Sequence, residues 1–368
     1  MKELVVKFIS LFFVFIFLVF CQNKDEKASQ KSEIRAFKDT VGFSFNVEQI
    51  ENVVQASEQL EKNALQKNLN MYGDKTWIAG ICPHDDHLLA GRVYVHLFQN
   101  LKAKRYVIFG VAHKAANWGA EDYLIFDSFN YWLGPFGPVK VSSLREQIIS
   151  QLPGSSFVVN NDWQSEEHSV EGIIPFIQYY HHDAEIVSIL VPYMNWERIK
   201  ELSQNLADAF SNIVAKYNWK LGEDISFICS NDGDHYGDQD WGGRNFAPFG
   251  TDEAGYLKAT SQDQNLSKTT LEGELTAQKI QEFCLRVWGE NDLKEYKIRW
   301  CGRFAIPMGL NTVRLLREKM NGPVLNGYFL RYDTSHNLGK LPLEDVGLGT
   351  TAPNNIRHWV GYSAIGFD

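Results

Sequence analysis

Apolar and polar positions follow two different spacings along most of this chain. Runs of consecutive apolar and β-branched residues predict buried strands at 77–82, 106–111, 123–126, 186–192, 225–230, 324–332 and 360–366. Apolar residues spaced three and four positions apart predict helices at roughly 47–68, 91–101, 142–151, 168–181, 196–217, 268–288 and 304–320. Strands that alternate with helices in this way predict an α/β fold with a central, mostly parallel or mixed sheet flanked by helices.

The first 21 residues follow a different pattern. Lys2 and Lys7 accompany an almost unbroken apolar run at 8–20, which ends at Cys21 and a polar stretch. This order is typical of a bacterial lipoprotein signal peptide, in which Cys21 becomes the lipidated first residue of the mature protein. The run is shorter than the ~20 apolar residues of a membrane-spanning helix. The pattern predicts a lipoprotein of the cell envelope, anchored to a membrane through its N-terminal lipid on the periplasmic or surface side.

Phe20 departs from this pattern, because the residue before a lipidated cysteine is usually small. A conventionally cleaved signal peptide, an uncleaved anchor and a buried core helix are the alternatives. Residues 22–40 contain too few apolar positions to pack, so they are expected to form a disordered linker. Residues 41–368 contain no repeat or internal linker and are expected to form one domain.

Composition removes several classes of function. The formal net charge is −9 and no basic stripe is present, so nucleic-acid binding is not expected. The chain also lacks the GxSxG, GxxxxGK, HExxH and GxGxxG motifs of common hydrolases and nucleotide-binding enzymes. Besides Cys21 there are four cysteines without a CxxC pair, which allow three disulfide pairings and favour none: Cys82, Cys229, Cys284 and Cys301.

Histidines and carboxylates follow three of the predicted strands, at the point where each strand ends. The first strand is followed by His84, Asp85, Asp86 and His87, the second by His113, and the fifth by Asp232 and His235. In open α/β sheets the carboxyl edge of the strands is where ligands bind. Imidazole and carboxylate are common ligands of transition metals. Three such strand ends predict one shared polar site that holds a metal, although each histidine alone is as well explained by a surface or hydrogen-bonding role.

Two further segments have both a structural and a functional interpretation. Glu167 and His168 are expected near the start of a helix, where a charged first turn capped by Ser165 is the favoured interpretation and proton transfer at the site is the alternative. Cys301 lies between Arg299 and Arg303 before a predicted helix, a position that favours the thiolate and suits a metal ligand. A buried small residue in a tight turn is the alternative for Cys301. Residues 236–250 are expected to form a loop, either a lid or a packed surface segment.

Taken together, these segments resemble the Memo family, which includes the proteins called AmmeMemoRadiSam system protein B. The matching motifs occur in the family's order, as PHDDH at 83–87, FGVAHK at 109–114, EEHSVE at 166–171, SNDGDHYG at 230–237, CGR at 301–303 and VGYSAIGF at 360–367. The resemblance implies a fold similar to that of the extradiol ring-cleaving dioxygenases. It also implies a pocket built from His84, His113, His235 and Cys301 with Asp232 beside them.

For such proteins the resemblance implies iron or copper binding and a copper-linked activity that forms oxidants; phosphotyrosine-peptide binding is proposed for animal members. This chain departs from the family's motifs at several positions. Asp85, Asp86 and His87 replace small and aromatic residues, Lys114 replaces a second histidine, and Phe304 stands where a histidine often follows CGR. Partners of the radical-SAM type need a reducing cytosol and are not expected for an exported chain.

The leading hypothesis is therefore a metal-dependent oxidoreductase-like enzyme that acts on a small molecule. Iron or copper, with zinc as an alternative, would be held by His84, His113 and either Cys301 or His235. Asp232, His168 or Glu167 would move protons, and the remaining pocket residues would be Asp85, Asp86, His87 and Arg303. A non-catalytic module that binds a peptide or metabolite in the same pocket, and a metal-dependent hydrolase, are the alternatives.

Overall fold

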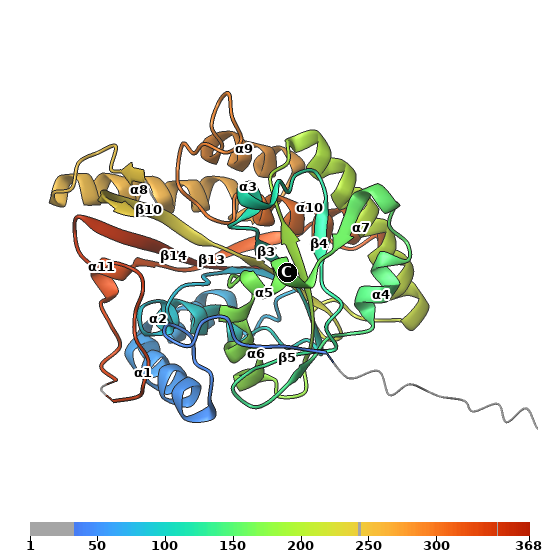
Figure 1. Ribbon diagram of the computed structural model, residues 1–368, viewed down its shortest axis with the longest axis horizontal. Coiled ribbons are helices and arrows are strands. Elements are labelled where there is room, and N and C mark those ends of the chain that lie inside the picture. Colours follow the sequence, from blue (N-terminus) through green and yellow to red (C-terminus); the bar gives the residue numbers. More distant parts are fainter. Residues whose placement is uncertain (1–32, 242–243, 344) are drawn as a thin grey trace, which may run out of the picture. The chain divides into compact units, whose positions relative to one another are not determined.

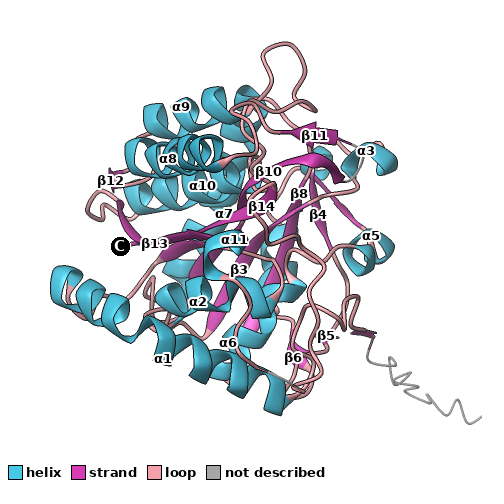
Figure 2. Cartoon of the chain, turned by 90° about the vertical axis from the view of Figure 1, so that its left-hand side faces the viewer, coloured by secondary structure: helices cyan, strands magenta, loops and turns pink. Residues whose placement is uncertain are grey.

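The computed structural model describes residues 33–368 apart from 242–243 and 344, and the predicted signal peptide lies outside these residues. Eleven strands of the described part form one mixed sheet (Figures 1 and 2). Its strands, in spatial order along the main path, are β11 (Arg244–Phe246), β10 (Asp232–Trp241), β14 (His358–Phe367), β2 (Ala79–Cys82), β9 (Ser226–Ser230), β3 (Arg105–Val111), β8 (Glu185–Val191), β4 (Leu124–Phe126) and β7 (Phe157–Val159). Strand β13 (Asn326–Thr334) pairs with β14 and with β12 (Gly273–Glu274).

The centre of the sheet is parallel and its flanks are antiparallel. β2, β9, β3 and β8 run in one direction, with Cys82 opposite Ser230 and Phe109 opposite Cys229. β14 is antiparallel to β2, β10 and β13, and β4 meets β8 in an antiparallel pair. The predicted α/β class with a mixed sheet is confirmed.

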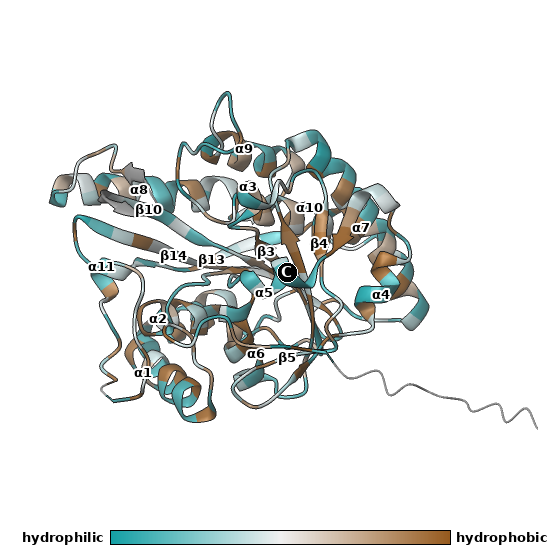
Figure 3. Cartoon of the chain, viewed as in Figure 1, coloured by the Kyte–Doolittle hydropathy of each residue, from teal (hydrophilic) through white to brown (hydrophobic). Residues whose placement is uncertain are grey.

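Helices cover both faces of this sheet and create two cores. One face carries α4 (Leu144–Ile149), α7 (Trp196–Tyr217), α9 (Ala277–Val287) and α10 (Ala305–Lys319), and the other carries α1 (Val47–Tyr72), α2 (His87–Phe98) and α6 (Ile174–Tyr180) (Figure 1). Strand β4 is brown and the outer helices alternate between teal and brown in Figure 3, as expected for strands buried on both faces. Helix α10 lies so close to the sheet that a Cβ on Gly309 would approach Cys229 Sγ to 2.4 Å.

The remaining helical elements complete the described fold. They are α3 (Ala115–Trp118), α5 (Asn161–Glu166), α8 (Glu253–Thr270), α11 (Ser335–Leu338) and the 3₁₀ turns Gly154–Ser156 and Glu171–Ile173. Side-chain caps fix several helix starts: Asn46 accepts from the Gln49 amide at α1, and Asn195 accepts from the Arg198 amide at α7. No helix in the described ranges is long and apolar enough to cross a bilayer.

The folded part begins earlier than the sequence predicted. Residues 22–40 were expected to form a linker, but β1 (Ile34–Arg35) pairs with β5 (Tyr131–Trp132), which pairs with β6 (Val139–Lys140). Arg35 is buried and its Nη1 lies 2.6 Å from Glu171 Oε2. The prediction was wrong for residues 33–40 because composition does not reveal a distant carboxylate that pairs with a single arginine.

Other differences concern element boundaries and type. Residues 236–250 contain the end of β10 and all of β11 instead of a loop. The helix expected at 168–181 is preceded by a 3₁₀ turn and starts at Ile174, and Ser165 lies inside α5 and caps no helix at Glu166. Helix α8 was not predicted, because its weakly amphipathic sequence lacks a clear apolar stripe.

Candidate metal centre

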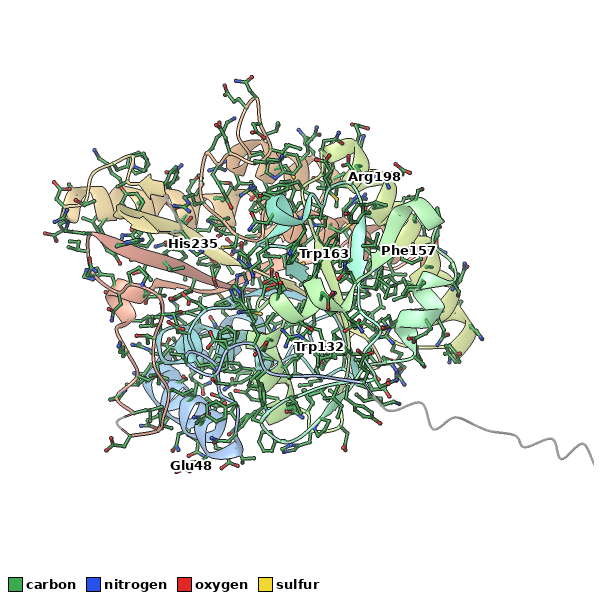
Figure 4. The ribbon with its side chains drawn as sticks, viewed as in Figure 1. Glu48, Trp132, Phe157, Trp163, Arg198 and His235 are labelled. Atoms are coloured by element: carbon green, nitrogen blue, oxygen red, sulfur yellow. The ribbon has the colours of Figure 1, made fainter. Side chains whose placement is uncertain are left out.

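The predicted convergence of strand ends is confirmed. β2, β3 and β9 are neighbours in the parallel part of the sheet, and the chain that leaves their carboxyl ends carries His84, His113 and Asp232. His235 follows on β10 and is labelled near the middle of Figure 4. Cys301 joins them through a hydrogen bond from its backbone amide to the carbonyl of Asp232, with N···O 3.1 Å.

A cavity of about 600 Å³ opens at this edge of the sheet. Its volume is in the range of small-molecule sites. Segments from both ends of the described chain contribute to its wall, which consists of Lys38, Asp39, Thr40, Val41, Phe43, His84, Asp85, Asp86, His113, His168, Asp232, His235, Tyr296, Arg299, Cys301 and Thr351.

His84 presents an unpartnered nitrogen at the cavity. The Ser230 hydroxyl donates to the carbonyl of Ser169 (2.6 Å), so the same oxygen accepts the Nδ1 proton of His84 (2.7 Å). Nε2 of His84 is thus the lone-pair nitrogen. It is buried and has no hydrogen-bond partner among the described residues, although Asp232 Oδ2 lies 3.3 Å away. Nε2 and an ionised Oδ2 this close repel each other, and either a metal cation bound by both or a proton on Asp232 relieves the repulsion.

Glu167 orients His113 in a similar way. Its carboxylate accepts from the backbone amide of His113 and from Nδ1 of the same residue, both at 2.8 Å. It also accepts from the amides of His168 and Ser169. Burial alone would raise the pKa of Glu167, but His113 and these donors hold it well below its usual value. Glu167 lies behind His113 and does not line the cavity, so its geometry fits an orienting role better than the predicted transfer of protons.

His168 lies against His113, with ring centroids 4.6 Å apart and planes 10° apart. Burial in the cluster, and then the adjacent His113, lower the pKa of His168 to about 4. The ring is therefore neutral near neutral pH and can accept a proton from a molecule in the cavity. His168 lines the cavity, and its predicted part in proton transfer stays a prediction.

Cys301 and His235 contact each other on the other side of the site, with Sγ and Nε2 2.7 Å apart. Burial, then Arg299, lower the pKa of His235 well below its usual value. Burial, then Asp232, raise the pKa of the Cys301 thiol. This direction opposes the expected preference for thiolate: α10 begins only at Ala305, and the Arg303 guanidinium lies over the Tyr296 ring.

Asp232 and Asp85 add carboxylates to the cavity. Asp232 Oδ1 accepts from the His84 amide (2.9 Å), and burial followed by the charge of Asp85 raises the pKa of Asp232. Asp85 Oδ2 accepts from the Tyr362 hydroxyl (2.6 Å), and burial followed by Asp86 raises the pKa of Asp85 to about 7. Both groups can hold or release a proton beside His84.

Three predicted pocket residues have other roles. His87 was expected on the same side of a turn as His84, but His87 starts α2 and points into the core, where its Nε2 contacts the carbonyl of Gly172 at 2.8 Å. Asp86 reaches the cavity wall, yet its carboxylate accepts from the amides of Thr351 and Ala352. Arg303 is buried behind the cavity wall, with its guanidinium 3.4 Å from the centroid of the Tyr296 ring.

Two other departures from the family motifs, Lys114 and Phe304, provide no ligand. Lys114 pairs with Glu166 outside the cavity (3.1 Å), and Phe304 stacks on Trp288. Sequence reasoning missed Ser230 and the cavity residues 38–41, 43, 296 and 351. Ser230 ends a predicted strand directly before the Asp232 segment, and this position was the available signal. The other residues lie in segments without a chemical motif.

The donor set fits a transition metal. Ligand atoms of His84, His113 and Cys301 lie within 4.8 Å of one another, as do those of Asp232, His235 and Cys301 and those of His113, Glu167 and His168. The first set fits best, because Nδ1 of each histidine donates a hydrogen bond and Nε2 keeps a lone pair that can bind a metal. Imidazole with thiolate suits zinc, iron or copper.

The sequence favoured no disulfide pairing, and the cysteines in the described part of the chain are all free. Cys82, Cys229 and Cys284 are buried.

Comparison with known proteins gives consistent matches. A family model described as Memo-like protein matches residues 49–351. A MEMO1 family protein of Pyrococcus horikoshii is 25% identical over 76% of this chain and 88% of its own length. A MEMO1 family protein of Pyrobaculum arsenaticum is 30% identical over 55% of this chain and 70% of its own length. One of Methanosarcina barkeri is 30% identical over 44% of this chain and 56% of its own length. The chain spans about half the length of the Methanosarcina relative and of one from Saccharolobus solfataricus. These relatives are archaeal, so the bacterial origin stays a prediction.

Proposed function

Because this chain belongs to the Memo-like family, we propose that it is a metal-dependent oxidoreductase that acts on a small molecule. Iron or copper would be held by His84, His113 and Cys301 and would supply redox chemistry and Lewis acidity. The observation that carries the proposal is the buried, unpartnered Nε2 of His84, which faces the same cavity as His113 and Cys301.

The residues of the chain would perform the remaining steps. The 600 Å³ cavity would exclude bulk water and hold the substrate beside the three donors. His168, neutral and stacked on His113, would accept a proton at a ring nitrogen. Asp232, whose pKa is raised by burial, would return a proton from Oδ2. Glu167 would keep His113 in the tautomer that leaves Nε2 available.

Oxygen consumption tests this function directly. The full chain would be reconstituted anaerobically with Fe(II) or Cu(I) and then exposed to oxygen with a panel of catechols and thiols. We expect consumption that depends on metal and substrate and is lost in Cys301→Ala. Metal-bound protein that consumes no oxygen with any reductant contradicts redox chemistry.

A second candidate is metal-dependent hydrolysis. The carboxylates of Asp85 and Asp232 beside His84 favour it, since a proton acceptor next to a hydrolytic metal activates water. Turnover of an ester panel only with added zinc or manganese distinguishes this candidate. If the purified protein binds no metal, a module that binds a peptide or metabolite in the same cavity becomes the better account.

We also propose that Cys21 carries a lipid that anchors the protein in the cell envelope. The support is the basic start, the apolar run at 8–20 and the cysteine that ends it. Incorporation of labelled palmitate that is lost in Cys21→Ser would support the anchor. Unlabelled protein in the soluble fraction would contradict it.

A further inference from the structure

An N-terminal segment of this chain forms part of the cavity wall. Residues 38–43, which we call the strap, precede the family-matched region at 49–351. Five of its residues line the cavity: Lys38, Asp39, Thr40, Val41 and Phe43. Histidines and acidic residues from the sheet edge form the rest of the wall together with Tyr296, Arg299, Cys301 and Thr351. The strap is therefore a part of the wall that lies outside the region matched by the family model.

One buried carboxylate holds the start of the strap. Glu171 accepts from Arg35 Nη1 (2.6 Å), from the Lys38 amide (2.8 Å) and from the Asp39 amide (3.0 Å). Arg35 Nη2 also donates to the carbonyl of Glu167 at 2.5 Å. The strap is thus tied to the same residue that orients His113, so its position and that of the donors are set together.

The end of the strap is held by two residues that depart from the family motif. His87 accepts the Ser44 amide at Nδ1 (2.9 Å), and its ring stacks on Phe43 with centroids 5.2 Å apart. Its backbone amide donates to the carbonyl of Gly42 (2.9 Å). A Cβ on Gly42 would approach Asp86 Oδ1 to 2.0 Å, so only glycine permits this close passage of the strap.

Asp86 connects the strap to the other side of the cavity mouth. It accepts from the amides of Thr351 (2.5 Å) and Ala352 (2.8 Å), and Gly349 donates its amide to the carbonyl of Val41 (2.8 Å). The strap and the segment at 349–352 are therefore hydrogen-bonded to each other and to the start of α2. A wall held by so many hydrogen bonds is rigid on the scale of a small ligand.

We infer that the strap is the selectivity wall of the metal pocket: it admits small molecules and excludes bulky ones, with Asp86, His87 and Glu171 as its positioning residues. The inference rests on the proposed function only in taking this cavity as the ligand site. Phe43 is the discriminating side chain, because it is buried at the cavity and lies between His87 and His168, whose ring centroid is 6.2 Å from its own.

Cys301 provides a probe of access that needs no metal. It is the partly exposed cysteine in the cavity, whereas Cys82, Cys229 and Cys284 are buried. The metal-free full chain would be treated with iodoacetamide, which is small, or with fluorescein maleimide, which is bulky. Labelling at Cys301 would be followed by peptide mass spectrometry. Both reagents attack the same thiolate, so the ratio of their rates cancels any change in the pKa of Cys301.

The variants are Phe43→Ala, which shortens the wall, and Asp86→Asn, which loosens its anchor and covers the case in which the first does not fold. The quantity compared is the rate of Cys301 labelling by fluorescein maleimide divided by the rate of labelling by iodoacetamide. We expect this ratio to rise about tenfold in both variants, because accessibility limits the bulky reagent. Phe129→Ala removes an equally buried ring outside the cavity and should leave the ratio unchanged. Melting temperatures identify variants that have loosened globally.

An unchanged ratio in folded Phe43→Ala or Asp86→Asn overturns the inference, and so does an equal rise in Phe129→Ala. Failure of the proposed function is recognised separately, as absence of bound metal in the unmodified chain. The labelling result does not depend on that outcome.

Discussion

Ser230 accepts the Nδ1 proton of His84 at 2.7 Å while its own hydroxyl donates to the carbonyl of Ser169. This relationship fixes the tautomer of a buried histidine and leaves Nε2 with a free lone pair that can bind a metal at the cavity. Metal binding in this cavity would depend on such supporting residues as much as on the ligands themselves.

Replacing Ser230 therefore weakens metal binding without removing a ligand. In Ser230→Ala, Nδ1 of His84 loses its partner and the ring can adopt the other tautomer. We expect metal affinity to fall about 10- to 100-fold, as for other residues that orient metal-binding histidines. Competition titration with a chromophoric chelator measures the change. Ser226→Ala, on the same strand but bonded to the carbonyl of Trp77, is the control; equal affinities in the two variants would argue against the assigned role of Ser230.

Glu167 has the same role for His113. Glu167→Gln removes the negative charge that holds the Nδ1 proton, and we expect metal affinity to fall by about tenfold or more. The neighbouring Glu166→Gln is a matched control, because Glu166 is exposed and pairs with Lys114 away from the cavity. Calorimetric titration of both variants tests the prediction. Loss of affinity in Glu166→Gln alone would reverse the assignment.

A separate ion cluster controls stability in acid. Glu61 is buried with Arg92, His96 and Arg331 around it. Burial alone would raise its pKa, but His96 and the arginines lower it from 4.5 to about 2. A carboxylate with a lowered folded-state pKa stabilises the fold above pH 4.5, and this contribution is lost as pH falls toward 2.

Glu61→Gln should therefore lower the free energy of unfolding by roughly 1–3 kcal/mol near neutral pH, and by progressively less as the solution is acidified. Denaturant unfolding of both proteins across this pH range gives the difference. A difference that stays constant with pH would contradict the ionic origin of the stabilisation.

Packing of α10 on the sheet predicts a further result. In Gly309→Ala the new methyl group would meet Cys229 Sγ at 2.4 Å and Phe109 at 2.7 Å. We expect a loss of about 1–3 kcal/mol in stability from overpacking. Gly154→Ala, where no heavy atom lies within 4 Å, should be neutral. Thermal unfolding measures both, and similar melting temperatures would show that α10 can shift to accept the methyl group.

Much of the framework followed from the sequence because its signals are local. The apolar runs located the central strands to within two residues at most ends, and the strand ends placed His84, His113 and Asp232 together. Spacing alone failed for His84 and His87, since the chain turns into α2 between them and sends the second ring into the core. Local patterns carry no information on which side of such a turn faces a cavity.

The contacts of the strap could not be predicted from the sequence for a related reason. Arg35 and Glu171 are 136 positions apart, and nothing near Arg35 marks it as a residue that will be buried. Asp86 and His87 were correctly noted as departures from the family motif. Their contacts with Thr351 and Ser44 depend on tertiary neighbours that no short pattern encodes.

The most direct test of the metal centre is the metal content of the full chain, purified without chelators or a histidine tag and measured by plasma mass spectrometry. The unmodified protein would be compared with His113→Ala and with His182→Ala, whose ring packs on Phe136 outside the cavity. We predict near-stoichiometric iron or copper in the unmodified protein and in His182→Ala, and its loss in His113→Ala. Absence of metal from all three, even after anaerobic reconstitution, would contradict a metal centre and favour the alternative that the cavity binds an organic ligand.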